Sequence, residues 1–169
     1  RLLILDVVID ALLAVDLTTK EVSVVSEKLT GTSFSDDSYY SFVINESYTT
    51  GYIVGSGDVN VRSVDLTSGV VQDISGLNLG SGENLEFPLD VALDEITNTL
   101  YVTDSRLSAI FKIDILTGNR EIISDVSRGS GDNILRAEGI ILCHEGLIAY
   151  VSDSAADAIF LVDLSSGDR

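Results

Sequence analysis

The sequence has little of several residue types on which disulfide scaffolds and many enzyme sites depend. Its 169 residues include one cysteine, one histidine and one proline, and no methionine or tryptophan. A single cysteine excludes an internal disulfide bond. A single histidine, in an expected turn, makes a Ser–His–Asp catalytic set untenable. No apolar run reaches the roughly 18 residues that a membrane-spanning helix needs, so membrane insertion is not expected.

Basic residues are also scarce. There are 10 lysines and arginines against 27 aspartates and glutamates, which gives a net charge of −17. Such a chain is repelled by phosphate backbones and by anionic lipid, so nucleic acid is excluded as a partner. An apolar share of 45% is normal for a folded protein and argues against disorder.

A repeat dominates what is present. Residues 99–118 read TLYVTDSRLSAIFKIDILTG, and residues 148–167 repeat them as IAYVSDSAADAIFLVDLSSG. Weaker copies occupy residues 51–69 and 2–20. The period is 49 residues without insertion or deletion, and it divides the chain into copies of about 1–38, 39–87, 88–136 and 137–169. A period of this length made of strands is typical of a β-propeller.

Each copy is expected to form one four-stranded antiparallel blade with strands A to D. In the third copy these strands are expected at 89–94, 99–104, 109–115 and 120–124. Strand C is apolar on both faces, so both faces need cover, which neighbouring blades supply. Phe111 and Phe160 are therefore expected at equivalent buried positions. Arg62 stands at the same position of the second copy, and because burying its charge alone would be costly, we expect it to be paired or to reach solvent. The predicted fold is therefore an all-β propeller with about three and a half blades present. The open blade edges predict a longer chain of six or more blades, or edges capped by another polypeptide or by copies of itself.

Four aspartates close strand C at 49-residue intervals, and each precedes a turn rich in Thr, Ser and Gly. A carboxylate there can accept hydrogen bonds from turn amides two or three residues on. We therefore predict a structural role for these residues, Asp16, Asp65, Asp114 and Asp163.

The LYVTDS and AIFKIDILTGNREIIS segments resemble the YWTD repeats of the low-density-lipoprotein receptor family, the NHL repeats and the gluconolactonase-type propellers. These families are typically six-bladed and include receptors, scaffolds and lactone hydrolases. The resemblance to the hydrolases implies one divalent metal on the propeller axis. The positions that match its ligands are Tyr40, Leu89 and Glu138, of which only Glu138 could bind a cation such as calcium. No cofactor is therefore predicted.

The turns between strands B and C and the links from D to the next A should meet on one propeller face. We expect a ligand to bind there, and the candidates are Asp104, Arg106, Arg136, Glu138, Asp153 and Asp157. A side chain that caps its own turn explains Asp104 and Asp153 equally well. Cys143 and His144 are the only pair of soft ligands, and adjacent strand residues point to opposite faces.

The sequence thus predicts a non-catalytic scaffold, extracellular or in the cell envelope, that offers its loop face to a protein or carbohydrate. One alternative is a metal-dependent, lactonase-like hydrolase with the rest of its site on other blades. Another is a structural protein that assembles through its propeller edges. Asn45-Glu46-Ser47 fits the pattern for N-glycosylation, which applies only in a glycosylating secretory pathway.

Overall fold

Strands and turns make up all the secondary structure of the described chain. The computed structural model describes residues 1–6, 8–27, 29, 40–56, 58–143 and 147–169. Within them no helix has the length and hydrophobicity that a membrane crossing requires. The described strands are β1 (Leu2–Asp6), β2 (Ala11–Val15), β3 (Val22–Glu27), β4 (Tyr40–Ile44), β5 (Thr50–Gly55), β6 (Asp58–Asp65), β7 (Val71–Ser75), β8 (Pro88–Asp94), β9 (Thr99–Asp104), β10 (Ala109–Asp114), β11 (Arg120–Ser124), β12 (Ala137–Cys143), β13 (Ile148–Asp153) and β14 (Ala158–Asp163).

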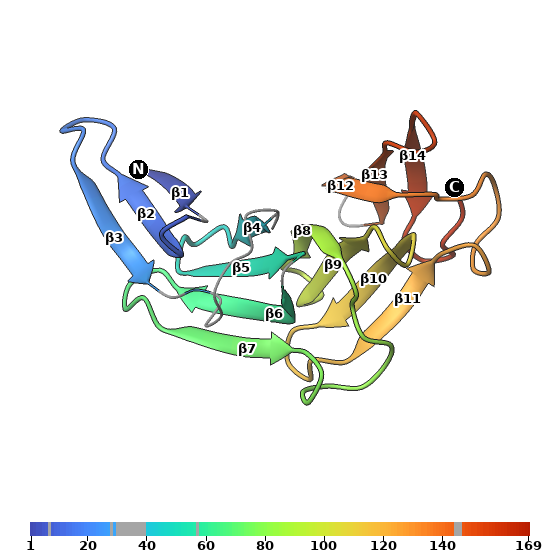
Figure 1. Cartoon of the computed structure of the whole chain (residues 1–169), viewed down its shortest axis with the longest axis horizontal. Coiled ribbons are helices and arrows are strands. Elements are labelled where there is room, and N and C mark those ends of the chain that lie inside the picture. Colours follow the sequence, from blue (N-terminus) through green and yellow to red (C-terminus); the bar gives the residue numbers. More distant parts are fainter. Residues whose placement is uncertain (7, 28, 30–39, 57, 144–146) are drawn as a thin grey trace.

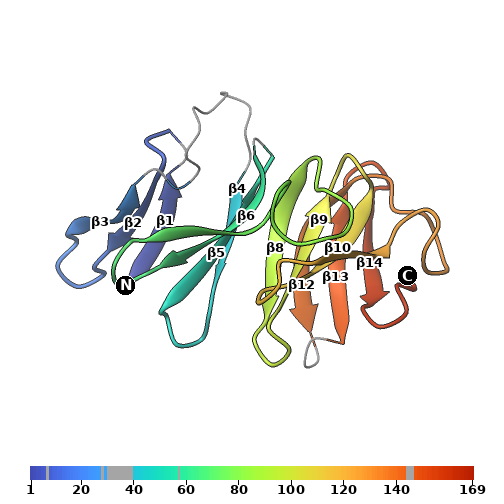
Figure 2. The ribbon, with the colours of Figure 1, turned by 90° about the horizontal axis from the view of Figure 1, so that it is seen from below.

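The strands form four antiparallel sheets, here called blades 1 to 4. Their strand orders are β1-β2-β3, β4-β5-β6-β7, β8-β9-β10-β11 and β12-β13-β14. Figure 1 shows the blades following one another along an arc, with β4, β8 and β12 on its inner side and β7 and β11 on its outer side. Figure 2 shows the blades side by side in a view turned by 90°. The predicted series of strands B-C-D, A-B-C-D, A-B-C-D and A-B-C is confirmed.

The third blade matches the expected strand positions closely. Strands β9 and β11 have the predicted bounds, β8 begins one residue earlier, and β10 ends one residue earlier. A shift of register also recurs between strands C and D in each blade that has both, at Leu12/Leu13, Val61/Arg62 and Ile110/Phe111. The repeat in the sequence is therefore a repeat of backbone geometry, including its irregularities.

The turn after strand C is held by the recurrent aspartate. Through its Oδ1 atom, each of Asp16, Asp65, Asp114 and Asp163 accepts hydrogen bonds of 2.7 to 3.0 Å from the N–H groups two and three residues on. Hydrogen bonds from the turn keep the pKa of all four carboxyls below its ordinary value. Gly118 ends its turn at a φ of 72°, where a side chain is disfavoured.

The apolar core lies between the blades rather than inside any one of them. Phe111 is fully buried between blades 3 and 2, in a cluster with Val54, Val61 and Val102. Phe160, its equivalent in blade 4, is only half-buried, so the expectation that both are buried alike is wrong for Phe160. Strand β11 covers one side of Phe111, whereas β14 is the last strand of its sheet.

Arg62 occupies the position in blade 2 that Phe111 occupies in blade 3. A guanidinium buried at that position needs a partner. Its Nε atom lies 2.8 Å from Oδ1 of Asp73 on the neighbouring strand β7, and only 13% of its side chain is exposed. Of the two expected outcomes, pairing or contact with solvent, the structure shows pairing.

A serine at the end of strand D joins each blade to the next. Ser75 Oγ donates a 2.7 Å hydrogen bond to the carbonyl oxygen of Gly118, and Ser124 Oγ donates one of 2.8 Å to that of Gly167. Ser26 makes the same bond to Gly69, at 2.6 Å. Blades 1, 2 and 3 therefore each hold the C–D turn of the blade that follows.

An arginine completes the seam between blades 2 and 3. Only 7% of Arg120 is exposed, and burial lowers its pKa. Within the described part of the chain, its guanidinium has no carboxylate partner. It donates instead to uncharged oxygens of Ser75, Gly76, Leu79, Gly82, Glu83 and Asn84, at 2.5 to 3.4 Å. The loop that links blade 2 to blade 3 is thereby wrapped around one side chain.

The Gly-Ser-Gly segment of that loop, residues 80–82, contacts the C–D turn of blade 3. Ser81 N and Oγ each donate a 2.8 Å hydrogen bond to Oδ1 of Asn119. A Cβ atom on Gly80 would lie 1.9 Å from the carbonyl oxygen of Gly118, so no other residue fits there without a shift. The contact recurs one repeat later, where Ser130 donates to Asp168.

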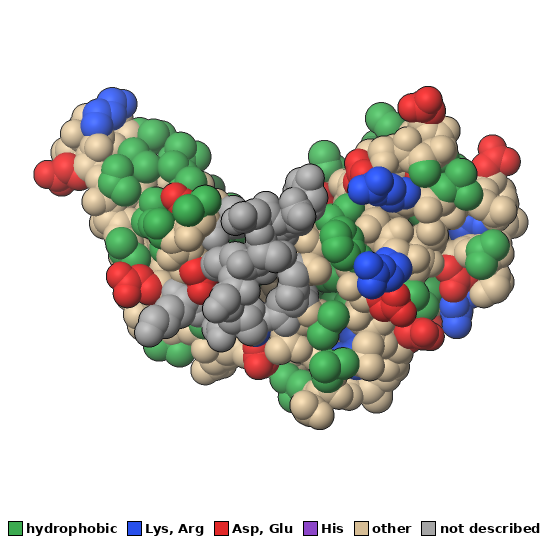
Figure 3. Space-filling model, viewed as in Figure 1, with side chains coloured by type: hydrophobic (Ala, Val, Ile, Leu, Met, Phe, Trp, Pro, Cys, Tyr) green, Lys and Arg blue, Asp and Glu red, His purple; other side chains and the backbone are tan. Residues whose placement is uncertain are grey.

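The two end blades keep apolar side chains on their outer faces. Figure 3 shows hydrophobic side chains gathered over the end formed by β1–β3. On blade 1 the exposed set includes Leu2, Ile4, Val22 and Val24, and on blade 4 it includes Ile141, Tyr150, Ile159 and Leu161. The equivalents of Ile4, Tyr150 and Ile159 in blade 3 are Val102, Tyr101 and Ile110, and all three are buried in the clusters between blades. These parts of the outer faces therefore have the chemistry of a blade interface.

Candidate functional site at the loop face

Asp104 joins the B–C turn of blade 3 to the loop that enters the blade. Its Oδ1 accepts hydrogen bonds of 3.0 Å from the N–H groups of Arg106 and Leu107. Its Oδ2 accepts bonds of 2.6 and 2.9 Å from the N–H groups of Glu86 and Phe87. The side chain is fully buried. One carboxylate therefore fixes the backbone of both segments of the loop face.

Asp153 does the same in blade 4. Its two oxygens accept four hydrogen bonds of 2.7 to 3.0 Å from the N–H groups of Leu135, Arg136, Ala155 and Ala156. Burial alone would raise the pKa of this carboxyl, but the four N–H donors outweigh that effect and the pKa lies below its ordinary value. Asp153 is thus held as a carboxylate.

These two aspartates are among the expected ligand-binding residues, and their geometry gives that role no support. Both are buried, and both oxygens of each carboxylate already accept two backbone N–H bonds. The alternative, in which each side chain caps its own turn, accounts for the hydrogen bonds that their Oδ1 atoms accept. The bonds to the loop 17 and 18 residues upstream depend on the tertiary fold, so the turn motif alone does not reveal them.

The exposed candidates form two small groups on this fixed backbone. The guanidinium of Arg106 lies over the ring of Phe87, 5.7 Å from its centroid. Arg136 Nε lies 3.3 Å from Oε1 of Glu138, and Ser154 Oγ donates a 2.7 Å hydrogen bond to the same oxygen. The side chains of Arg136 and Glu138 are 54% and 37% exposed. The loop face thus presents two cations, an aromatic ring and a carboxylate to solvent.

Asp157 is exposed, and the backbone conformation accounts for its residue type. Its φ is 52°, close to the values of 53° at Asp10 and 50° at Ser108 in the same position of the B–C turns of blades 1 and 3. Aspartate tolerates this left-handed region better than most residues. Nothing else about Asp157 indicates ligand binding.

The positions that correspond to metal ligands in the gluconolactonase-type propellers lie at the start of the inner strands. Glu138 is bonded to Arg136 and Ser154, and Leu89 has no ligand atom in its side chain. The side chain of Tyr40 lies outside the described residues, as does His144, while Cys143 is free and half-buried. In the described part of the chain, no three His, Cys, Asp or Glu side chains are placed to hold a metal ion.

Asp90 is the polar residue of the inner strands that the sequence analysis missed. Its Oδ1 accepts a 2.5 Å hydrogen bond from Ser41 Oγ on β4, and its Oδ2 accepts one of 2.8 Å from Ile140 N on β12. It therefore links three inner strands. The available signal is the column Ser41, Asp90 and Gly139, which is small or polar in every copy with a strand A.

Comparison with known proteins supports the fold. No family model matches the sequence, and no curated protein matches it. A protein in the crystal structure of a nidogen/laminin complex matches with a TM-score of 0.69 and 12% identity, over 93% of this chain and 52% of that one. An auxiliary nutrient binding protein from Bacteroides thetaiotaomicron VPI-5482 matches with a TM-score of 0.69 and 14% identity, over 89% and 42% of the two chains.

A protein of unknown function from the same bacterium matches with a TM-score of 0.59 and 14% identity, over 85% of this chain and 40% of that chain. The first two neighbours are propeller proteins, and the sheets described above are propeller blades. The chain therefore has the β-propeller fold, and it spans about half, or less, of the solved chains it matches.

The site makes a prediction about pH, tested with Asp153→Asn. The folded-state pKa of Asp153 is below the ordinary value of 3.8, so folding favours the charged form. The stability that the charge contributes is fully present above that ordinary value and is lost as the pH falls through the folded-state pKa. We expect wild type to exceed the variant in free energy of unfolding at pH 7, and the difference to shrink below about pH 4.

Urea unfolding of both proteins at pH 7, 5, 4 and 3 measures this difference. Comparison with the variant is necessary because acid also neutralises the net charge of −17, which relieves repulsion throughout the chain. A difference that stays constant or grows toward pH 3 contradicts the prediction.

Proposed function

We propose that this chain is part of a β-propeller binding module that presents its loop face to a protein partner outside the cytoplasm or in the cell envelope. The observation that carries the proposal is the exposed group formed by Arg106 on Phe87 and by Arg136 with Glu138. Arginine and aromatic side chains are enriched in protein interfaces and among their strongest contributors.

The supporting geometry is rigid. The carboxylates of Asp104 and Asp153 fix the backbone beneath these side chains, so little conformational entropy is lost when a partner binds. Arg106 and Arg136 also place two positive charges on one face of a chain whose net charge is −17. An acidic or polar surface patch on the partner therefore fits this region better than a basic one.

The neighbours are consistent with a binding role. One is found in a nidogen/laminin complex and another is described as a nutrient binding protein. We take from them only that propellers of this geometry serve as binding modules, and we propose the same for this chain, without a catalytic step.

Two charge-matched double variants test the proposal. Arg106→Ala/Arg136→Ala removes the cations of the loop face, and Lys20→Ala/Lys112→Ala removes two exposed cations from other parts of the molecule. Each protein is applied to an array of extracellular proteins and to a glycan array. We expect a protein ligand whose affinity falls at least about tenfold in the arginine variant and is unchanged in the lysine variant.

Equal effects of the two variants would mean that charge, not this site, determines binding. Binding to glycans alone would overturn the choice of a protein partner. The absence of any bound protein would overturn the proposal as a whole.

A further inference from the structure

A cavity of about 330 Å³ lies between blades 2 and 3. It is near the start of β5, at the end of the blade opposite its B–C turn, and is therefore separate from the loop face. Both blades have all four of their strands, so the cavity has complete walls on either side. The walls come from β5, β6 and β7 of blade 2 and from the C–D turn of blade 3, and they include Thr50, Tyr52, Ser63, Gln72, Ile115 and Leu116.

A short side chain beside a tyrosine accounts for the open space. In blade 2, Tyr52 lies opposite Ser63 in the strand pairing. In blade 3 the equivalent pair is Tyr101 and Lys112. The long stem of a lysine can cover apolar surface beside it, and Tyr101 is only 5% exposed, whereas Tyr52 is half-buried. The cavity is therefore a feature of the seam between blades 2 and 3 and not of the repeat.

The polar side chains of the lining have no partner within the described part of the chain. No hydrogen bond to another described residue reaches the side-chain polar groups of Thr50, Tyr52, Ser63 or Gln72. By contrast Thr99, the equivalent of Thr50 in blade 3, is buried and accepts a 3.0 Å hydrogen bond from a neighbouring threonine. Hydroxyl and amide groups both donate and accept, so this lining suits a ligand that also does both.

The charges around the cavity favour a neutral ligand. The lining contains no lysine or arginine, and its carboxylate, that of Asp73, is paired with Arg62 at 2.8 Å. Burial and, to a lesser extent, the charge of Glu95 raise the pKa of Tyr52, so its hydroxyl is protonated at neutral pH. An anion or a cation would lose its hydration here without gaining an unpaired opposite charge in the lining.

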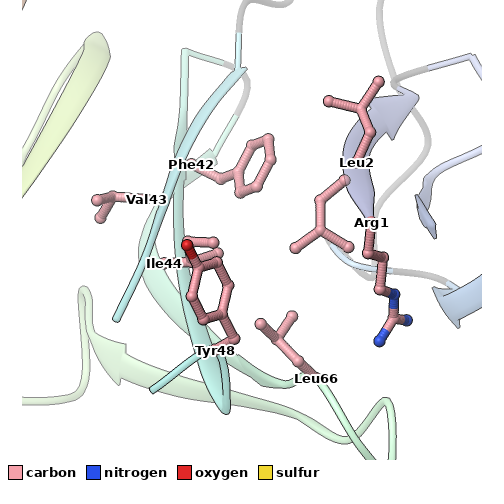
Figure 4. A pocket seen from close by; sticks show the side chains of 8 residues that line it. Arg1, Leu2, Phe42, Val43, Ile44, Tyr48 and Leu66 are labelled. Carbon is pink, nitrogen blue, oxygen red and sulfur yellow. The ribbon is translucent and has the colours of Figure 1, made fainter. Parts of the chain in front are cut away.

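The cavity of about 440 Å³ beside β1 differs in its chemistry. Figure 4 shows its lining, which is mainly apolar and includes Leu2, Phe42, Ile44 and Leu66. An aromatic ring combined with several polar groups that lack partners therefore distinguishes the cavity between blades 2 and 3.

We propose that the cavity between blades 2 and 3 binds one neutral pyranose ring of a carbohydrate. The apolar C–H face of the sugar packs on the ring of Tyr52, with Ile115 and Leu116 beside it. The sugar hydroxyls exchange hydrogen bonds with the hydroxyl and amide groups of the lining. A volume of about 330 Å³ is within the range of sites for small ligands. This site does not depend on the proposed function of the loop face.

The substitution Ser63→Lys tests the proposal, because it gives blade 2 the residue that blade 3 has at the equivalent position. The control, Thr67→Lys, adds the same charge at an exposed residue of the C–D turn of blade 2. The probes are the methyl glycosides of glucose, galactose, mannose and N-acetylglucosamine, titrated into each ¹⁵N-labelled full chain. We expect one or more to bind wild type, with the largest amide shifts in residues 50–52, 63 and 115–117.

The affinity should fall at least about tenfold in Ser63→Lys and be unchanged in Thr67→Lys. A second pair of variants, Gln72→Ala and Glu121→Ala, changes equivalent positions of blades 2 and 3, of which only Gln72 lines this cavity. We expect weaker binding in the first of these variants alone. The amide spectrum of each variant without sugar shows that it is folded.

Equal affinity of wild type and Ser63→Lys would overturn the assignment to this cavity. So would shifts centred on the loop face, or loss of sugar binding in the Arg106→Ala/Arg136→Ala variant. Tetramethylammonium is the probe for a cationic ligand, and its binding in the absence of glycoside binding would overturn the choice of ligand. An absence of all binding would overturn the proposal, while leaving the proposed function of the loop face unaffected.

Discussion

Replacement of Asp104 by alanine is expected to lower the free energy of unfolding by about 3 to 5 kcal/mol, because four backbone N–H donors lose their buried acceptor. The site is fully buried within blade 3, which has a blade on either side. Water could reach these donors only by opening the turn or the loop. Urea unfolding at pH 7 measures the change.

Asp104→Asn is the intermediate case, since an amide keeps one acceptor oxygen and loses the charge. We expect wild type, asparagine and alanine to follow in order of decreasing stability. Ser105→Ala is the control, because the hydroxyl of Ser105 makes only a long 3.4 Å bond to the carbonyl oxygen of Phe87. A loss below about 1 kcal/mol for Asp104→Ala, comparable with an exposed hydrogen bond, would show that the loop does not depend on this carboxylate.

The seam between blades 2 and 3 should be comparably sensitive at Arg120. Arg120→Ala is expected to cost about 3 kcal/mol or more, because it removes hydrogen bonds to several oxygens of the D–A loop, among them the carbonyl oxygen of Glu83, and creates a cavity. Arg120→Lys should recover little, since one ammonium cannot reproduce the planar set of donors. The measurements are urea unfolding and hydrogen exchange of the loop amides.

Arg169 provides a matched comparison, since it makes the equivalent bonds to Ser124, Asp125, Arg128 and Asp132 but is more exposed. Arg169→Ala should therefore cost less than Arg120→Ala. Equal losses would indicate that burial contributes little, and a larger loss at Arg169 would contradict the interpretation of the seam.

The blades could be predicted from the sequence because two independent periods agree. Alternation of apolar residues gives the strand positions, and the 49-residue period gives their number, so the bounds in blade 3 were predicted to within one residue. The pairing of Arg62 could be predicted because an unpaired charge is costly to bury. The burial of Phe160 was predicted wrongly because equivalent positions of the repeat have different neighbours in the last blade, where β14 has no further strand beside it.

The loop face could be predicted only in part. The sequence indicates that the B–C turns and D–A loops meet, and it identifies the exposed residues Arg106, Arg136 and Glu138. It cannot distinguish a carboxylate that faces solvent from one that accepts bonds from a distant loop, so Asp104 and Asp153 were grouped with them. Asp90 was not predicted because the metal-ligand position implied by the resemblance to gluconolactonase-type propellers is that of its neighbour, Leu89.

The serine-to-glycine bonds of the seams run in one direction along the chain. Ser26, Ser75 and Ser124 each bind the turn of the following blade, 43 residues on, so each of the two middle repeats contains the donor for one boundary and the acceptor for the other. A gene duplication that adds 49 residues would therefore supply a complete boundary without any new pair of residues having to arise together. The number of blades in such a protein could change during evolution more readily than the sequence of any one blade.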